Sequence, residues 1–236
     1  MRQWIIFDKK PLTEYGLYIS GGGTFNAPQR DVESLEMPGR NGELTIDKGR
    51  YLNIDVEYPA FICRDFSDNL QSLRNWLLTR SGYKVLQDTY HPDEYRLARY
   101  LSGLEVTPSQ SLREGEFSLV FNCKPQRFLR RGDQAITFTA SGVIKNPTLT
   151  IAKPMVRVYG TGTITINGIS IQITTNASYT DIDCETENAY RGSTNLNGNI
   201  ALNANHDFWS LSPGSNTVTL GTGITRVEIK PRWWVL

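Results

Sequence analysis

Alternating apolar and polar positions run through most of the chain and predict a protein built mainly of β-strands. The first clear stretch covers residues 44–62, which we expect to form a long strand or a bent pair of strands. Its alternate apolar positions are Leu52, Ile54, Val56 and Tyr58. The segment PGRNG at 38–42 precedes it, and its Asn-Gly pair suits a turn with positive φ. Pro59 is expected to end or bulge the strand, because proline donates no ladder hydrogen bond.

One segment has the spacing of a helix instead. From about residue 67 to residue 80, apolar side chains recur at steps of three and four and share one helical face. They are Phe66, Leu70, Leu73 and Leu77, with Trp76 beside them. The side chain of Ser67 or Asp65 is expected to cap the N-terminus of this helix, and Gly82 suits its C-terminal stop.

Strands resume after the helix, with candidates at 83–87, 95–106 and 116–123. The last is the clearest, because alternate positions place four apolar residues on one face. These are Phe117, Leu119, Phe121 and Cys123. The pattern then breaks between residues 125 and 132, which indicates a domain boundary near Arg131.

The remainder has no helical pattern and consists of short strand candidates separated by turn signals. Isoleucines alternate on both sides of Asn167-Gly168 over residues 164–173, a strong hairpin signal. Further strands are expected at 135–140, 148–152, 155–159, 178–184, 199–203, 207–211, 216–220 and 224–230. So many short antiparallel strands predict a sandwich or a jelly roll.

Charge supports the same division of the chain. It has 236 residues and a net charge of +1, with 34 charged residues in 1–130 and 15 in 131–236. The second part is richer in threonine and asparagine, which suits exposed β surface. We therefore expect one domain at 1–131 and another at 132–236. The near-neutral total argues against a dedicated nucleic-acid binder and a polybasic membrane-surface protein.

The N-terminal residues do not predict a secretion signal, since the apolar run from Trp4 to Phe7 is followed at once by charged residues. No stretch has the length and apolarity of a membrane span, so no membrane insertion is expected. The widely spaced Cys63, Cys123 and Cys184 form no metal-binding pattern and are expected to be free thiols, mostly buried. These features predict synthesis in a reducing cytoplasm.

Four acidic residues at a period of two are expected to share one strand face. They are Asp181, Asp183, Glu185 and Glu187. Paired carboxylates can serve a glycosidase or a calcium site. The favoured interpretation is a solvated face of like charges, because Ile182 and Cys184 alternate with them and suit the core.

Other signals for catalysis are weak. His91 and His206 are expected to be ordinary surface histidines, and no GxSxG elbow supports a Ser-His-Asp site. The Gly21–Gly23 run lacks the lysine and the helix of a phosphate loop, so it is expected to be a turn. We predict no catalytic residue, no metal site and no cofactor.

Three arginines, Arg127, Arg130 and Arg131, lie at the expected domain junction. They form either a hydrated linker or a contact with an acidic partner surface. Residues 131–133 also match an RGD adhesion tripeptide, but three-residue matches are common by chance.

Three tryptophans of the second domain are candidate contacts, namely Trp209, Trp233 and Trp234. An exposed tryptophan on a β-sandwich can stack on a sugar ring. Core packing or a subunit contact is the simpler explanation.

Several motifs, in this order, resemble the distal tail (Dit) proteins of long-tailed, non-contractile bacteriophages, the siphophages. In the first half they are MPGRNGELTIDKGRY at 37–51, DVEYP at 55–59 and LRNWL at 73–77. In the second half they are NPTL at 146–149, the isoleucine hairpin, DIDC at 181–184 and FWSLSPGSN at 208–216. The resemblance spans nearly the whole chain, and the order of the motifs is more specific than any one of them.

The resemblance implies a mainly β fold: an N-terminal β-sandwich or split barrel with one α-helix, then a C-terminal galectin-like jelly-roll β-sandwich. It implies a structural protein of the virion, made in the bacterial host cytoplasm, that acts as a baseplate hub at the tail tip. Family members form a ring, usually a hexamer and sometimes two rings back to back, whose N-terminal domains surround a channel for DNA. The implied partners are the tail tube protein, the tail fibre or lysin protein and receptor-binding proteins.

Two other functions stay open on the sequence. One is a lectin-like module that recognises host cell-wall sugars through Trp209 or Trp233. The other is an enzyme, a glycosidase that uses Asp181 and Asp183. Neither has a motif that supports it beyond the residue types themselves.

Overall fold

A computed structural model describes residues 3–23, 25–104, 106–108, 115–175 and 178–236. The chain divides into two compact units, Met1–Arg127 together with Leu236, and Phe128–Val235. Each unit has its own cluster of buried apolar side chains.

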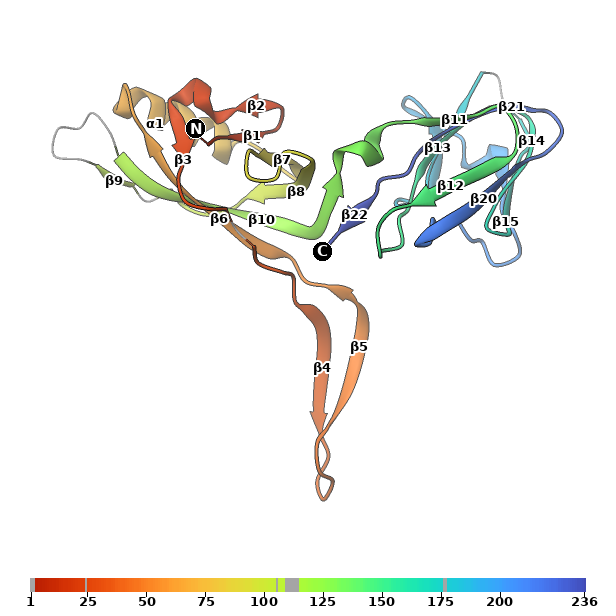
Figure 1. Cartoon of the computed structure of the whole chain (residues 1–236), viewed down its shortest axis with the longest axis horizontal. Coiled ribbons are helices and arrows are strands. Elements are labelled where there is room, and N and C mark those ends of the chain that lie inside the picture. The colour runs from red at the N-terminus through yellow and green to blue at the C-terminus, as the bar shows by residue number, and fades with distance from the viewer. Residues whose placement is uncertain (1–2, 24, 105, 109–114, 176–177) are drawn as a thin grey trace. The chain divides into compact units, whose positions relative to one another are not determined.

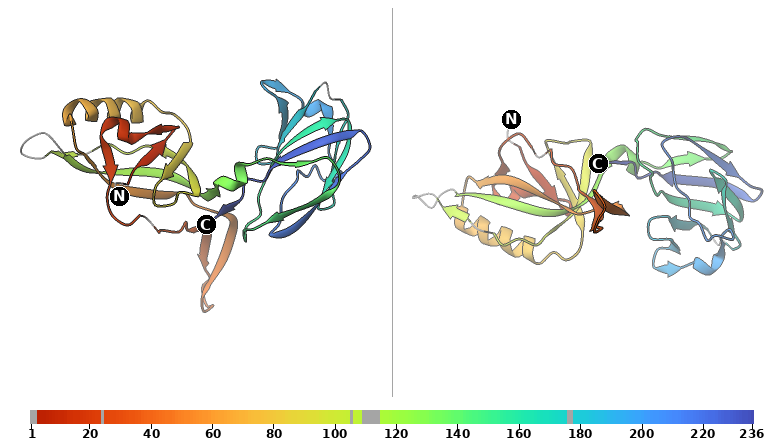
Figure 2. Two further views of the ribbon diagram at one scale, coloured as in Figure 1. Left: turned by 45° about the horizontal axis from the view of Figure 1, so that its top comes forward. Right: turned by 90° about the horizontal axis from the view of Figure 1, so that it is seen from below.

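The first unit is built on one curled sheet with the strand order β2-β1-β7-β8-β10-β6-β3, and β9 pairs with β10 (Figure 1). Helix α1 lies over one face of this sheet (Figure 2). The elements are β1 (Ile5–Phe7), β2 (Lys10–Pro11), the 3-10 helix η1 (Leu12–Tyr15), β3 (Leu17–Ile19), β6 (Ile54–Ile62), α1 (Phe66–Leu78), β7 (Lys84–Asp88), β8 (Glu94–Tyr100), β9 (Val106–Pro108) and β10 (Gly115–Leu129).

The predicted helix and its apolar face are confirmed. All four residues of the predicted stripe are buried, and Trp76 packs edge-on against Phe7 with ring centroids 5.7 Å apart. The predicted side-chain cap is wrong. Asp65 occupies the N-cap position with a φ of 43°, and no side-chain hydrogen bond caps the helix. Burial of the stripe therefore fixes this helix more than its N-terminal cap does.

Strands β6 and β10 form the centre of the sheet, with Tyr58 opposite Leu119 and Ile54 opposite Cys123. The alternate residues predicted for one face of β10 are all buried. The expected end or bulge at Pro59 is wrong, because β6 continues to Ile62. The carbonyl of Pro59 accepts the N–H of Ser20, 2.9 Å away, on the side of β6 where β3 has just ended. The nitrogen of Pro59 faces the same side, so its lack of an N–H costs no ladder hydrogen bond.

A separate two-stranded sheet, β4 (Arg30–Glu36) with β5 (Glu43–Tyr51), projects from the first unit (Figure 1). The stretch predicted at 44–62 is thus a pair of strands, β5 and β6, and it divides at Leu52 and Asn53.

The second unit is a β-sandwich of two sheets, with the orders β11-β21-β13-β16-β17-β18 and β12-β20-β14-β15-β19. Its elements are the 3-10 helix η2 (Arg130–Asp133), β11 (Ile136–Phe138), β12 (Gly142–Asn146), β13 (Met155–Gly160), β14 (Gly162–Ile166), β15 (Ile169–Ile173), β16 (Thr180–Asp183), β17 (Asn188–Arg191), β18 (Thr194–Asn195), the 3-10 helix η3 (Asn197–Asn199), β19 (Ile200–Ala201), β20 (Gly214–Leu220), β21 (Ile224–Lys230) and β22 (Trp234–Val235).

The isoleucine hairpin is confirmed as β14 and β15, and Asn167 and Gly168 turn it with φ values of 49° and 83°. Strands at 148–152 and 207–211 are wrong, since these segments meet only in an isolated bridge between Ala152 and Leu211. Strands β12, β17 and β18 were not predicted from the sequence. Leu149 is 95% exposed, so the alternation around it reflects a loop surface and not a sheet face.

The two ends of the second unit lie side by side. The N–H of Leu129 donates to the carbonyl of Trp233 at 2.8 Å, and the N–H of Arg232 donates to the carbonyl of Gly132 at 2.9 Å. The entry and exit segments of this unit are therefore joined by backbone hydrogen bonds.

Candidate functional site

The hairpin β4–β5, called the arm below, is the most distinctive surface of the first unit. Its two strands pair with each other and form their own sheet. Along β4 and β5 every side chain is exposed except for Asp31 and Tyr51, which are half-buried. An extended hairpin that buries so little of itself is weakly stabilised alone.

One face of the arm is apolar toward its tip. Leu35 lies directly opposite Leu44, and Ile46 lies opposite Glu33 on the same face. Met37 follows Leu35 by two positions and continues this face beyond the last pair. These four apolar side chains are 41% to 47% exposed. Scattered exposed apolar residues are ordinary, whereas a contiguous group on an extended hairpin is typical of an interaction surface.

Ion pairs stiffen the base of the arm. On the apolar face Arg50 Nε lies 2.7 Å from a carboxylate oxygen of Asp31, and Lys48 Nζ lies 3.7 Å from Glu33. On the other face Arg30 Nε lies 2.5 Å from Asp47. The backbone N–H of Gly49 and the hydrogen bond from Arg30 lower the pKa of Asp47. These contacts link the two strands where the arm joins the unit, around the bulge at which their register shifts between Arg30 and Val32.

The tip of the arm carries an acidic pair on the opposite face. Glu36 lies directly opposite Glu43 at the last rung before the turn. Like charges in this arrangement destabilise a hairpin. Gly39 and Gly42 have φ values of 77° and 83°, which confirms the predicted positive-φ turn at 38–42. The arm thus presents an apolar strip on one face and, at its tip, an acidic pair on the other.

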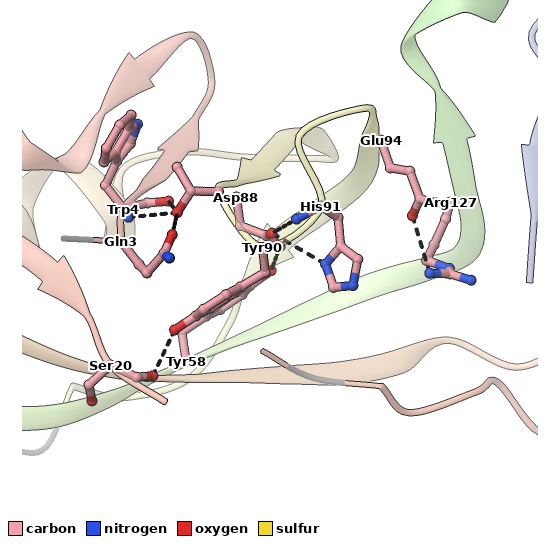
Figure 3. Close-up of polar contacts among 10 residues, drawn as sticks. Gln3, Trp4, Ser20, Tyr58, Asp88, Tyr90, His91, Glu94 and Arg127 are labelled. Carbon is pink, nitrogen blue, oxygen red and sulfur yellow. Dashed lines mark hydrogen bonds and ion pairs between the residues drawn. The ribbon is translucent and has the colours of Figure 1, made fainter. Parts of the chain in front are cut away.

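A polar cluster surrounds Asp88, the last residue of β7 (Figure 3). One oxygen of Asp88 accepts the Tyr58 hydroxyl at 2.7 Å, and the other accepts the backbone N–H of His91 at 2.8 Å and lies 3.3 Å from His91 Nδ1. Burial, and secondarily the Asp88 charge, raises the pKa of Tyr58 well above its usual value. His91 is therefore part of a network that joins β6, β7 and the following turn.

The cavity beside this cluster is small, about 10 Å³, which is room for one water molecule. Arg96 lines it, and its buried Nη1 atom has no hydrogen-bond partner among the described residues. Glu94 and Arg127 form an ion pair at 3.2 Å on the same side. The space is too small for an organic substrate, so it offers no catalytic pocket.

The expectation of four carboxylates on a solvated strand face is wrong for two of them. Asp181 and Asp183 are 3% and 8% exposed, and all of β16 is buried. Arg157 makes two hydrogen bonds to Asp181, of 2.7 and 2.9 Å, and Arg232 does the same to Asp183. Glu185 follows in an exposed turn. These guanidinium pairs were missed because both arginines lie on other strands or loops.

The tryptophans do not form an open platform. Trp209 and Trp233 are 1% and 4% exposed and belong to the core of the sandwich. The indole N–H of Trp209 donates to the carbonyl of Ile169 at 2.9 Å, and that of Trp234 donates to Ile151 at 2.9 Å. Trp234 is half-buried. The faces of Trp209 and Trp233 are therefore unavailable to a sugar ring.

The junction arginines lie in different surroundings. Arg127 pairs with Glu94 and also donates to the carbonyl of Leu236, whereas Arg130 and Arg131 are exposed in η2. Gly132 is buried, and a Cβ there would lie 2.4 Å from the backbone nitrogen of Trp233. The glycine of the RGD tripeptide is thus held in a packed contact.

Across the described ranges, no group of three or more His, Cys, Asp or Glu side chains is arranged to hold a metal ion. The helices in those ranges are also too short or too polar to cross a bilayer.

Solved structures match the fold over its full length. The Dit protein of phage SPP1, described as a paradigm of the hub adsorption apparatus in phages that infect Gram-positive bacteria, matches with a TM-score of 0.72 at 16% identity over 99% of both chains. A chain of the activated phage p2 baseplate with strontium matches with a TM-score of 0.52 at 11% identity over 97% of both chains. The calcium form of that baseplate gives a TM-score of 0.52 at 9% identity.

No known family matches the sequence itself. No curated protein matches it either. The structural matches nevertheless confirm that this chain has the Dit fold, as its motifs implied.

Proposed function

We propose that this chain is a structural subunit of a phage tail-tip hub, a distal tail protein of the virion. The observation that carries the proposal is the match to SPP1 Dit over 99% of both chains. That protein is described as a paradigm of a hub adsorption apparatus, and the match extends over both units of this chain.

The arm supports self-assembly into a ring. A ring subunit contacts its neighbour through two different surfaces, and closure satisfies both. The apolar strip of Leu35, Leu44 and Ile46 is exposed on its own chain, and a second copy supplies the surface that covers it.

The remaining roles follow from this assignment. Residues 1–131 form a hexameric ring around a channel that lets DNA pass. The ring exists singly or as one of two rings stacked back to back. Residues 132–236 form an outward, galectin-like unit. The tail tube protein and the fibre or lysin protein bind the two ring faces, and receptor-binding proteins dock at the periphery. Arg130, Arg131 and Trp234 are proposed contacts with these partners. The protein is made in the host cytoplasm and resides at the tail tip.

A catalytic role has less support. Asp181 and Asp183 each form a two-bond pair with an arginine, which leaves neither carboxylate poised to receive or donate a proton to a substrate.

The test is the oligomeric state of the purified chain, measured by light scattering and negative-stain microscopy, in two arm variants. Leu44→Lys places a charge on the apolar face. Thr45→Lys places the same charge on the opposite face, one residue away, and serves as the control. Because the arm packs against so little of its own chain, neither substitution should change the melting temperature of the subunit.

We expect rings from the unmodified chain and from Thr45→Lys, and monomers from Leu44→Lys. Monomers of the unmodified chain at all concentrations contradict the hub proposal. Rings that survive Leu44→Lys contradict the role of the arm but not the hub itself.

A further inference from the structure

The chain contains three Asn-Gly pairs, and each of them lies outside the strands. They are Asn41-Gly42 at the tip of the arm, Asn167-Gly168 between β14 and β15, and Asn197-Gly198 in η3. In such a pair the side-chain amide can reach the next backbone nitrogen easily, because glycine has no Cβ to block the approach. All three asparagines are exposed, so exposure alone does not distinguish them.

The side chain of Asn167 is held at both of its polar atoms. Its Nδ2 donates to the carbonyl of Ser210 at 3.3 Å and to Oδ1 of Asn216 at 2.6 Å. Its Oδ1 accepts the backbone N–H of Thr217 at 3.1 Å. The amide group therefore cannot turn toward the nitrogen of Gly168 unless these bonds break.

The side chain of Asn197 is held in the same manner. Its Oδ1 accepts the backbone N–H of Ala189 at 2.6 Å, and its Nδ2 donates to Oδ1 of Asn188 at 3.1 Å. Its own backbone N–H donates to Oδ1 of Asn195 at 2.8 Å. This asparagine is thus fixed on both its side chain and its backbone.

Asn41 differs from the other two. As far as the described residues extend, no hydrogen bond or ion pair holds its side chain or the N–H of Gly42. The bond from the N–H of Arg40 to the carbonyl of Met37, 3.2 Å long, closes the turn just before this pair. A Cβ at Gly42 would meet nothing within 4 Å, so the surroundings leave room for the side chain of Asn41 to rotate.

We propose that Asn41 is a site of spontaneous deamidation, whereas the two held asparagines are protected. The backbone nitrogen of Gly42 attacks the side-chain carbonyl carbon of Asn41 and closes a five-membered succinimide ring. The bond to the amide nitrogen breaks, and ammonia leaves with the proton that the Gly42 nitrogen has lost. Water then opens the ring at either carbonyl and leaves aspartate or isoaspartate. Nothing is oxidised or reduced, and water is the only co-reactant.

The reaction changes the tip of the arm. Either product adds a carboxylate close in sequence to the rung at which Glu36 lies opposite Glu43. Further like charge at this end of the hairpin opposes the pairing of its strands. Isoaspartate also adds one carbon to the backbone and so alters the turn. The inference goes beyond the hub role and does not depend on it, because every group involved belongs to one chain.

The test is to incubate the purified full chain in mildly alkaline buffer and to follow the three Asn-Gly peptides by mass spectrometry over several days. Labelling with an isoaspartyl methyltransferase identifies isoaspartate. Leu44→Lys is incubated in parallel, so that a neighbouring copy over the arm cannot hide the turn in both samples. Asn41→Gln is the matched control, because it keeps the amide but would need a larger ring. A further sample of the unmodified chain is incubated in urea.

We expect Asn41 to convert about tenfold faster, or more, than either held asparagine in the folded protein, since each of those must first break its hydrogen bonds. Urea should remove the difference, and the peptide that carries Asn41→Gln should stay unchanged. If Asn41 converts no faster than Asn167 and Asn197 in both the unmodified chain and Leu44→Lys, the proposal is wrong. A difference that persists in urea also overturns it, because the local sequence and not the fold would then set the rates. Whether the chain forms rings affects neither outcome.

Discussion

The guanidinium of Arg232 makes two parallel hydrogen bonds with the carboxylate of Asp183, from Nη1 to Oδ1 at 2.7 Å and from Nη2 to Oδ2 at 2.9 Å. Burial alone would raise the pKa of Asp183. The Arg232 hydrogen bond and charge, together with the backbone N–H groups of Glu185 and Thr186, outweigh burial and lower the pKa. This pair fastens the segment after β21 to the end of β16.

The Asp183 pair makes the second unit sensitive to acid. Because the folded-state pKa lies below the unfolded value of about 3.9, the pair stabilises the unit fully above that value. The stabilisation is lost as the pH falls through the folded-state pKa. We expect Asp183→Asn to lower the free energy of unfolding by about 3 kcal/mol at neutral pH and to flatten its decline in acid. Urea unfolding at a series of pH values measures both effects, and Glu185→Gln, in the exposed turn, should change neither.

Two adjacent leucines at the end of α1 allow the effect of core packing to be measured apart from the effect of helix propensity. Leu77 is fully buried, whereas Leu78 is 61% exposed. Leu77→Ala should lower the free energy of unfolding of the first unit by about 2–5 kcal/mol, because it leaves a cavity. Leu78→Ala should change it by less than about 0.5 kcal/mol. Equal effects of the two substitutions in urea unfolding are incompatible with the packing of this helix.

The three thiols should differ in reactivity. Burial raises the pKa of Cys123 and of Cys184 to about 12, so almost no thiolate forms at either residue in mildly alkaline solution. Cys63 is only half-buried. We expect iodoacetamide to label Cys63 first in the folded protein, as read by peptide mass spectrometry. All three should react alike in denaturant, and rapid labelling of Cys184 in the folded state would show that the sandwich core is open.

Gly132 should tolerate no side chain. A Cβ at this position would lie 2.4 Å from the backbone nitrogen of Trp233, and a backbone atom cannot move aside cheaply. Gly132→Ala should therefore lower the melting temperature of the second unit, at a cost of about 1–3 kcal/mol. Gly198→Ala in η3, where a Cβ meets nothing within 4 Å, is the control and should have little effect.

The sequence predicted the parts of the fold that depend on periodicity. The four-residue stripe of α1 and the alternation along β10 each require one buried face, so spacing alone identified them. The hairpin at Asn167-Gly168 depends on local turn chemistry, and adjacent residues in the sequence are enough to determine it. The motifs that resemble Dit proteins identified the fold as a whole.

The rest depends on contacts between distant segments. A period of two in β5 looks the same whether the apolar face is covered or exposed, so Leu44 and Ile46 gave no sign that their strand leaves the unit. Asp181 and Asp183 resembled a solvated face because their partners, Arg157 and Arg232, lie 24 and 49 residues away in the chain.

Backbone hydrogen bonds join Leu129 to Trp233 and Gly132 to Arg232. They have a consequence for how such a chain can evolve. A unit whose entry and exit segments lie side by side can be exchanged for another with closely spaced ends, because the remaining chain needs to span no new distance. We expect that a foreign binding domain grafted between Leu129 and Trp233 would leave the first unit folded. In a hub subunit of the proposed kind, such an exchange would replace the second unit while the unit proposed to build the ring stays the same.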